Sequence, residues 1–171
     1  MKTGLVWLIG KPGSGKTTVG EYLSLSHDHI EYYSFSALLK QFQKEVGEDG
    51  FHQETRDKVY TLLADLSARK LVIVSGNPYT PTSFGDMKKL TSLFRVIHFS
   101  APDTLVLERL NERGRVVFVH DGSSQEERLK KFNDNVQPLI DEVLKEGGLT
   151  ISVEGKTKEG LAEEVILAVL N

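Results

Sequence analysis

A glycine-rich segment near the start of the chain has the residue types and spacing of a loop that binds phosphate. Residues 10–17 read G-K-P-G-S-G-K-T and fit the pattern G-x-x-x-x-G-K-[ST]. Glycines allow backbone conformations from which successive N–H groups point inward at an anion. Lys16 adds a positive charge for the β- and γ-phosphates of a nucleotide, and the Thr17 hydroxyl is an oxygen ligand for Mg²⁺. The predicted nucleotide contacts are Gly10, Lys11, Pro12, Gly13, Ser14, Gly15, Lys16 and Thr17.

The elements on either side of the loop support this interpretation. An apolar run at residues 5–9 predicts a buried strand before the loop, and residues 16–26 predict a helix after it. A helix that begins at the end of the loop adds its positive terminus to the phosphate site. Strand, loop and helix therefore follow one another in the order that phosphate binding requires.

Short apolar runs and amphipathic segments alternate along the rest of the chain. Further strands are predicted at 30–33, 71–74, 95–99 and 149–153, and helices at 36–46, 55–68, 82–93, 102–112, 124–145 and 157–170. Pro138 lies inside the long helix predicted at 124–145 and should kink it. Because most of the strands are continuously apolar, they predict a parallel sheet covered on both faces, an α/β three-layer sandwich.

The composition excludes several classes of protein. The net charge of the 171 residues is −3, whereas a broad nucleic-acid-binding surface would need a basic excess. The absence of cysteine excludes disulfides, thiol catalysis and cysteine-ligated zinc. We find neither a secretory leader nor the ~18 apolar residues of a membrane span. We therefore expect one cytoplasmic domain, 1–171, that is a monomer and binds neither nucleic acid nor membrane.

The loop is similar to that of the adenylate kinase-like nucleoside monophosphate kinases. That family has G-x-P-G-x-G-K, with its proline at the position of Pro12 and a threonine at the position of Thr18. The resemblance implies the P-loop containing nucleotide kinase fold with a five-stranded parallel sheet. It also implies ATP as the phosphoryl donor, Mg²⁺ as the cofactor and Thr18 as a further nucleotide contact. An acceptor lobe at about 34–70 and a short lid at about 113–123 follow from the same resemblance.

Two later segments also resemble this family. Residues 102–113, P-D-T-L-V-L-E-R-L-N-E-R, are similar to a motif with P-D, an acidic residue followed by arginine, and a later arginine. Residues 128–140 resemble R-L-x-x-Y followed by proline and two hydrophobic residues. The resemblance implies that Arg109 lies against the adenine. It also implies that Arg113 and Arg128 contact phosphates at the reaction centre, which makes them catalytic together with Lys16.

The predicted acceptor side departs from the family pattern. The family's T-G-D after the second strand is F-S-A at residues 35–37, and its D-G-F-P-R-T after the third strand is S-G-N-P-Y-T at residues 75–80. Tyr79 thus replaces an arginine that would clamp a phosphate with two hydrogen bonds, whereas Lys40 could still neutralise one phosphate. Phe35, Tyr79 and Tyr33 could form an aromatic wall for a flat acceptor, or simply pack within the lobe. The expected acceptor contacts are Ser34, Phe35, Lys40, Gly76 and Tyr79.

Ser75 stands where the family has a carboxylate that holds a magnesium-bound water. Magnesium can still lie between Thr17 and the triphosphate, because it keeps several of its own waters. We therefore expect ATP binding to depend less steeply on Mg²⁺ than in an ordinary member of the family.

These observations favour an ATP-dependent phosphotransferase that moves the γ-phosphoryl group of Mg·ATP to a nucleoside monophosphate. The changed acceptor motifs leave open a kinase of another small-molecule acceptor. The serine at position 75 leaves open an ATP-binding regulatory module with weak ATPase activity.

Overall fold

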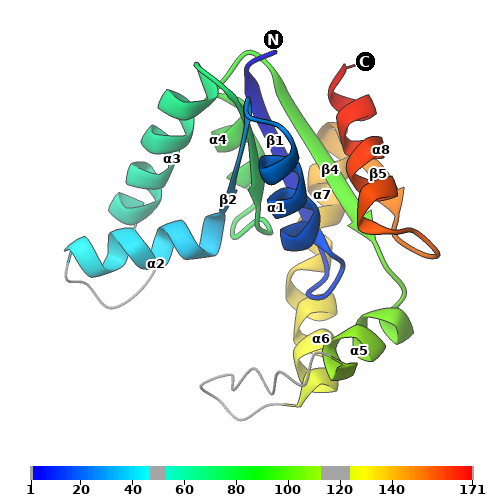
Figure 1. Ribbon diagram of the computed structural model, residues 1–171. Coiled ribbons are helices and arrows are strands. Elements are labelled where there is room, and N and C mark those ends of the chain that lie inside the picture. The colour runs from blue at the N-terminus through cyan, green and yellow to red at the C-terminus, as the bar shows by residue number, and fades with distance from the viewer. Residues whose placement is uncertain (1, 47–52, 113–123, 171) are drawn as a thin grey trace.

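The structure, a computed structural model, describes residues 2–46, 53–112 and 124–170. A five-stranded sheet lies at its centre (Figure 1). Its strands are β1 (Gly4–Gly10), β2 (Ile30–Ser34), β3 (Leu71–Ser75), β4 (Phe94–Ser100) and β5 (Leu149–Ser152). Their order is β2-β3-β1-β4-β5, and each neighbouring pair is parallel. The predicted α/β class and the five-stranded parallel sheet are therefore confirmed.

Helices cover both faces of the sheet, which is why its strands are continuously apolar. One face packs mainly against α1 (Lys16–Ser26) and α8 (Lys158–Leu170). The other face packs against helices that include α2 (Phe35–Val46), α3 (Gln53–Ser67) and α4 (Ser83–Lys88). All residues of β1 and β3 are buried, as the central position of these strands requires.

Two helical predictions need correction. The helix predicted at 124–145 is two helices, α6 (Gln125–Asn135) and α7 (Gln137–Gly147), which meet at Val136. Pro138 therefore lies in the first turn of α7, where its missing N–H costs no helical hydrogen bond. The helix predicted at 82–93 ends at Lys88. By Leu93 the chain already lies beside β1, because the Leu93 carbonyl accepts a hydrogen bond from the Leu5 amide at 2.9 Å.

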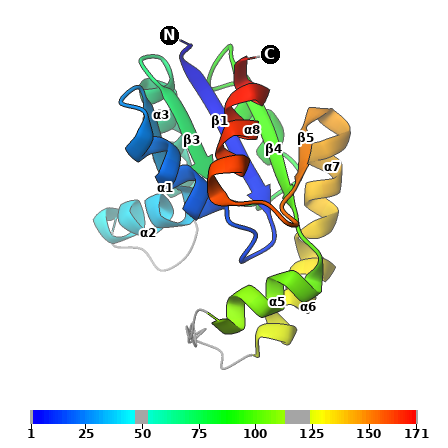
Figure 2. The ribbon, with the colours of Figure 1, turned by 45° about the vertical axis from the view of Figure 1, so that its right-hand side comes forward.

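Because the strands are parallel, the segments that follow them begin at the same end of the sheet, its carboxyl edge. Gly10 at the end of β1 pairs with Phe99, and Leu8 pairs with Ser75 at the end of β3. The segments that follow β1, β3 and β4 therefore leave the sheet side by side. Helix α5 (Asp103–Glu112) and helix α6 lie beyond this edge, below the sheet in Figures 1 and 2. A ligand at the carboxyl ends of the strands would lie between these helices and the sheet.

Candidate functional site

The segment between β1 and α1 has the backbone conformation of a phosphate-binding loop. Gly13 has φ 75° and Gly15 has φ 98°, in the left-handed region that a side chain disfavours. At Gly10 a Cβ atom would lie 2.5 Å from the Phe99 carbonyl oxygen, so only glycine lets β1 and β4 approach this closely. The glycines of the sequence pattern thus occupy positions where backbone geometry requires them.

Hydrogen bonds within the loop, and one to the segment that follows β3, hold the loop in place. The Ser14 amide donates to the Lys11 carbonyl at 3.2 Å, and the Ser14 residue is fully buried. The Gly10 amide donates to Asn77 Oδ1 at 2.8 Å. Asn77 follows Gly76 in the segment after β3, and sequence reasoning did not include it in the site. Its place within the altered S-G-N-P-Y-T motif is the only feature of the sequence that points to it.

Lys16 is folded into the loop. Its Nζ donates to the Gly10 and Lys11 carbonyl oxygens at 2.7 Å each and to Ser14 Oγ at 3.2 Å. Burial lowers the pKa of Lys16 from 10.5 to about 7, because desolvation penalises the charged ammonium. The ammonium is therefore held against the loop by two of its carbonyl oxygens, which phosphate oxygens could replace.

The start of α1 offers an oxygen ligand for a hard cation. Thr17 is exposed in the first turn of α1, so its hydroxyl is accessible. The described residues contain no group of three acidic or histidine side chains that could hold a metal ion. One hydroxyl ligand suits Mg²⁺, which takes its other ligands from phosphate and water.

Ser75 has a partner within the protein. The Ser75 hydroxyl is buried at the end of β3 and lies 2.6 Å from the Tyr32 hydroxyl, from the neighbouring strand β2. The Tyr32 ring in turn packs against α1 at Gly20, where a Cβ atom would lie 2.1 Å from the ring. Two hydroxyl groups thus occupy the position at which the resembling family has a carboxylate.

A cavity of about 220 Å³ adjoins the loop on the side of α1 and α5. Its lining brings together Thr18 and Arg109, which the family resemblance assigned to nucleotide binding. It also includes Lys156, from the segment between β5 and α8, and Lys158, the first residue of α8, both of which sequence reasoning missed. The K-T-K run at residues 156–158, which begins four positions after the end of β5, was the available indication. The full lining is Gly15, Thr18, Val19, Arg109, Glu112, Lys156, Lys158 and Leu161.

An aromatic group lies on the other side of the loop, at the ends of β2 and β3. The Phe35 ring centroid is 5.7 Å from that of Tyr79 and 5.8 Å from that of Tyr60 on α3. Gly76 packs directly against the Phe35 side chain. Tyr60 was not predicted, whereas Tyr33 turns its hydroxyl to Glu31 Oε2 at 2.7 Å. The structure thus brings Phe35, Gly76 and Tyr79 together, with Tyr60 as a new member.

Polar residues lie on the same helices as this aromatic group or next to them. Burial is the main cause that raises the pKa of both Tyr60 and Tyr79, so both phenols stay protonated at neutral pH. Arg56, one turn before Tyr60 on α3, donates from Nη2 to Gln53 Oε1 at 2.6 Å, while its buried Nε has no hydrogen-bond partner among the residues that the structure describes. Ser34 is half-buried at the end of β2, and Lys40 is exposed on α2.

The predicted catalytic arginines are located only in part. Arg128 is half-buried in the first turn of α6, where its Nη1 lies 3.5 Å from Gln125 Oε1. Arg113 and the predicted lid at 113–123 lie outside the described residues.

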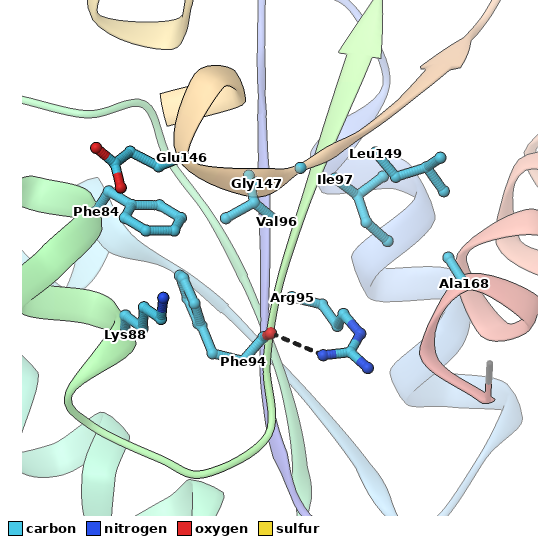
Figure 3. Close-up of a pocket in the computed structure, with 11 residues that line it drawn as sticks. Phe84, Lys88, Phe94, Arg95, Val96, Ile97, Glu146, Gly147, Leu149 and Ala168 are labelled. Carbon is cyan, nitrogen blue, oxygen red and sulfur yellow. Dashed lines mark hydrogen bonds between the residues drawn. The ribbon is translucent and has the colours of Figure 1, made fainter. Parts of the chain in front are cut away.

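A cavity of about 600 Å³ lies at the opposite end of the sheet (Figure 3). It opens beside the first residues of β4 and β5, and the Phe84 and Phe94 rings meet there at 5.6 Å. Lys88, Arg95 and Glu146 are the charged residues of its lining. It is separated from the phosphate loop by the length of the strands, so its size does not make it the nucleotide site.

No helix among residues 2–46, 53–112 and 124–170 combines the length and apolar character needed to cross a membrane.

Curated relatives extend over nearly the whole chain. A shikimate kinase from Acinetobacter baumannii (strain AYE) is 29% identical over 176 residues, which cover 97% of this chain and 92% of that protein.

Solved structures share the fold. A shikimate kinase from Acinetobacter baumannii in complex with shikimate superposes with a TM-score of 0.62 at 20% identity, covering 98% of this chain and 93% of that one. A gluconokinase from Sinorhizobium meliloti 1021 gives a TM-score of 0.63 at 15% identity, covering 98% and 92%. These similarities confirm the predicted P-loop kinase fold.

The resemblance to nucleoside monophosphate kinases is therefore correct at the level of the fold. The relatives and structures named above are a shikimate kinase and a gluconokinase, so they do not support a nucleoside monophosphate in particular. A model of the AAA domain family, AAA_18, matches residues 6–130, which contain the phosphate loop, α1 and strands β2–β4. Because this match covers most of its length, the chain belongs to the AAA domain family AAA_18.

Proposed function

We propose that the protein is an ATP-dependent kinase that transfers the γ-phosphoryl group of Mg·ATP to a small-molecule acceptor. The observation that carries the proposal is the loop at residues 10–17, whose glycines have positive φ and whose Gly10 and Lys11 carbonyl oxygens hold the Lys16 ammonium. Phosphoryl transfer depends mainly on positioning and on electrostatic stabilisation, and this loop supplies both. The curated relative named above is a kinase and matches the chain over nearly its full length.

The donor nucleotide would occupy the side of the loop next to α1 and α5. Its phosphates would replace the two carbonyl oxygens that Lys16 contacts. Its base would enter the cavity beside Thr18 and Arg109. Mg²⁺, when bound at Thr17, would neutralise charge on the phosphates. Arg128 would approach the phosphates from α6, as Arg113 would by the same family resemblance.

The acceptor would lie on the opposite side, against Phe35, Tyr60 and Tyr79. Arg56 lies one turn before Tyr60 on α3, and its buried Nε, which has no hydrogen-bond partner within the described residues, suits an acceptor with an anionic group. Tyr79 stands in place of the phosphate-clamping arginine of nucleoside monophosphate kinases. We therefore favour a small polar metabolite over a nucleoside monophosphate as the acceptor, in agreement with the kinases named above.

The proposal is tested by ADP release from Mg·ATP with each of several acceptors. The panel contains shikimate, gluconate, AMP, GMP, CMP, UMP and dTMP, with the Lys16→Ala protein as control. We expect one non-nucleotide acceptor to raise turnover well above background and to yield a phosphorylated product in the ³¹P NMR spectrum. If a nucleoside monophosphate is the only active acceptor, our assignment of the acceptor is wrong, whereas the assignment as a kinase stands.

A single-turnover experiment separates the kinase from a regulatory ATP-binding module. ATP that binds tightly but is hydrolysed slowly, at a rate that no acceptor changes, would overturn the kinase proposal. Acceleration by an acceptor, with ADP and phosphorylated product formed in equal amounts, would support it.

A further inference from the structure

One side chain of the phosphate loop is bound to a different part of the fold. Lys11 Nζ donates to Asp103 Oδ1 at 2.5 Å and to the Ala101 carbonyl at 3.1 Å. Asp103 is the first residue of α5, and its other carboxylate oxygen accepts from Asn133 Nδ2 of α6 at 2.9 Å. A continuous chain of hydrogen bonds thus joins the loop, the start of α5 and the second half of α6.

Each oxygen of the Asp103 carboxylate accepts a hydrogen bond from one of these two partners. The hydrogen bond from Lys11 is the largest cause that lowers the pKa of Asp103, and the one from Asn133 adds to it. The side chain of Lys11 is mostly buried, at 18% exposure, whereas that of Asp103 is 47% exposed. A carboxylate this close to a phosphate site would repel the nucleotide unless a cation neutralised it, and Lys11 does so.

This chain of hydrogen bonds connects the phosphate loop to two helices that lie outside the sheet. Figures 1 and 2 show α5 and α6 beyond the carboxyl edge of the sheet, away from the strands. Helix α6 carries Arg128, five residues before Asn133. Leu129 and Phe132 are buried and hold one side of α6 against the core. Apolar contacts have little directional preference, so a hydrogen bond fixes the position of α6 relative to the loop more closely than they do.

We propose that Lys11, Asp103 and Asn133 form a latch that positions helix α6, and with it Arg128, relative to the phosphate loop. The contribution of Arg128 to transfer rests on the proposed function, whereas the placement of α6 does not. Asp103 and Asn133 are positioning residues, which contact neither substrate nor reacting atoms. Lys11 links the latch to the loop through its side chain, while its backbone remains available to the nucleotide.

The position of α6 can be measured without any assay of activity. Because the chain has no cysteine, the substitutions Leu25→Cys on α1 and Glu126→Cys on α6 create two unique sites for spin labels. Leu25 is 87% exposed and Glu126 is exposed, so labels should not disturb packing. We expect a narrow distance distribution between the labels, which Asp103→Ala and Asn133→Ala broaden. An unchanged distribution in both variants would overturn the latch.

Kinetics then test the link to Arg128. Asp103→Ala should lower kcat about five-fold and Asn133→Ala about three-fold, with the KM for ATP unchanged, in line with the modest strength of exposed ion pairs and hydrogen bonds. Asp134→Asn is the matched control, because it removes an ion pair with Lys130 within α6 and does not touch the loop. Broadened distances with unchanged kcat would overturn the link to Arg128.

A double-mutant cycle tests whether Lys11 and Asp103 act together. The Lys11→Met/Asp103→Asn protein should lose no more of kcat than the more severe single variant, because either change already opens the latch. Full additivity of the two losses would contradict a shared role. If wild-type protein phosphorylates no acceptor, the proposed function fails, and the label distances still decide the latch.

Discussion

The two sides of the phosphate loop differ in how their binding groups are built. On the donor side, backbone amides, glycines and Lys16 form the site within one continuous segment, residues 10–17. On the acceptor side, Phe35, Tyr60 and Tyr79 come from α2, α3 and the segment after β3. Phosphate recognition thus depends on local backbone geometry, whereas acceptor recognition depends on side chains that the fold assembles. The donor side can therefore stay constant while the acceptor side changes.

The largest effect should come from the donor side. Lys16→Ala should weaken ATP binding or turnover by about 10²-fold or more, because it removes a preorganised contact to the phosphates. Isothermal titration with ATP and the rate of ADP release measure the two effects. Lys145→Ala, on the exposed face of α7, is the control and should leave both unchanged. Normal ATP binding and turnover in a folded Lys16→Ala protein would refute the phosphate-loop assignment.

A change on the acceptor side should leave the donor side intact. Arg56→Ala should raise the KM for the acceptor about ten-fold, the expected loss of one charged hydrogen bond, and leave ATP affinity within a factor of two. Arg69→Ala, at the end of the same lobe, is the matched control, since its Nε donates to the Asp65 carbonyl at 3.2 Å. If Arg56→Ala weakened ATP binding as much as it weakened acceptor binding, the two sides of the loop would not be distinct.

The protonation of Lys16 should make ATP binding depend on pH. In the free protein burial lowers the pKa of Lys16 to about 7. Bound phosphate favours the ammonium and raises that pKa again, so ATP binding takes up a proton above pH 7. Affinity should therefore fall as pH rises, about five-fold between pH 7 and pH 8 for a pKa of about 7.

Calorimetry of ATP binding in buffers of different ionisation enthalpy measures this proton uptake directly. Lys16→Met should abolish it, since methionine fills a similar volume without a titrating group. Proton uptake that persists in Lys16→Met would assign the pH dependence to another group.

The smallest effect should come from Ser75, on the border between the two sides. In Ser75→Asp, the gain in ATP affinity on adding Mg²⁺ should be about three-fold larger than in the wild type, because a carboxylate would attract the hydrated ion. Titration of ATP binding with Mg²⁺ measures this response. Tyr32→Phe is the control, because it removes the hydroxyl partner of Ser75 without adding charge. A wild-type Mg²⁺ dependence already as steep as that of Ser75→Asp would contradict our expectation.

The amino-acid sequence alone determined the fold class and the donor loop. Apolar strands such as β1 and β3 show their burial directly, and the glycines at 10, 13 and 15 show where the backbone must turn. Both features have local signals, because an apolar run and a glycine spacing are each contained in a few consecutive residues. The boundary between α6 and α7 was harder to predict, since one proline fits either a kinked helix or the first turn of a new one.

Only the tertiary structure decided which distant side chains meet the loop. Asn77 reaches Gly10 across 67 positions of the sequence, and Asp103 reaches Lys11 across 92. Lys156 and Lys158 enter the donor cavity from the segment after the last strand. In a parallel sheet each strand is followed by a crossover of many residues, so neighbours at its carboxyl edge are remote in sequence. Contacts between such remote residues follow from strand order and register, which no local pattern contains.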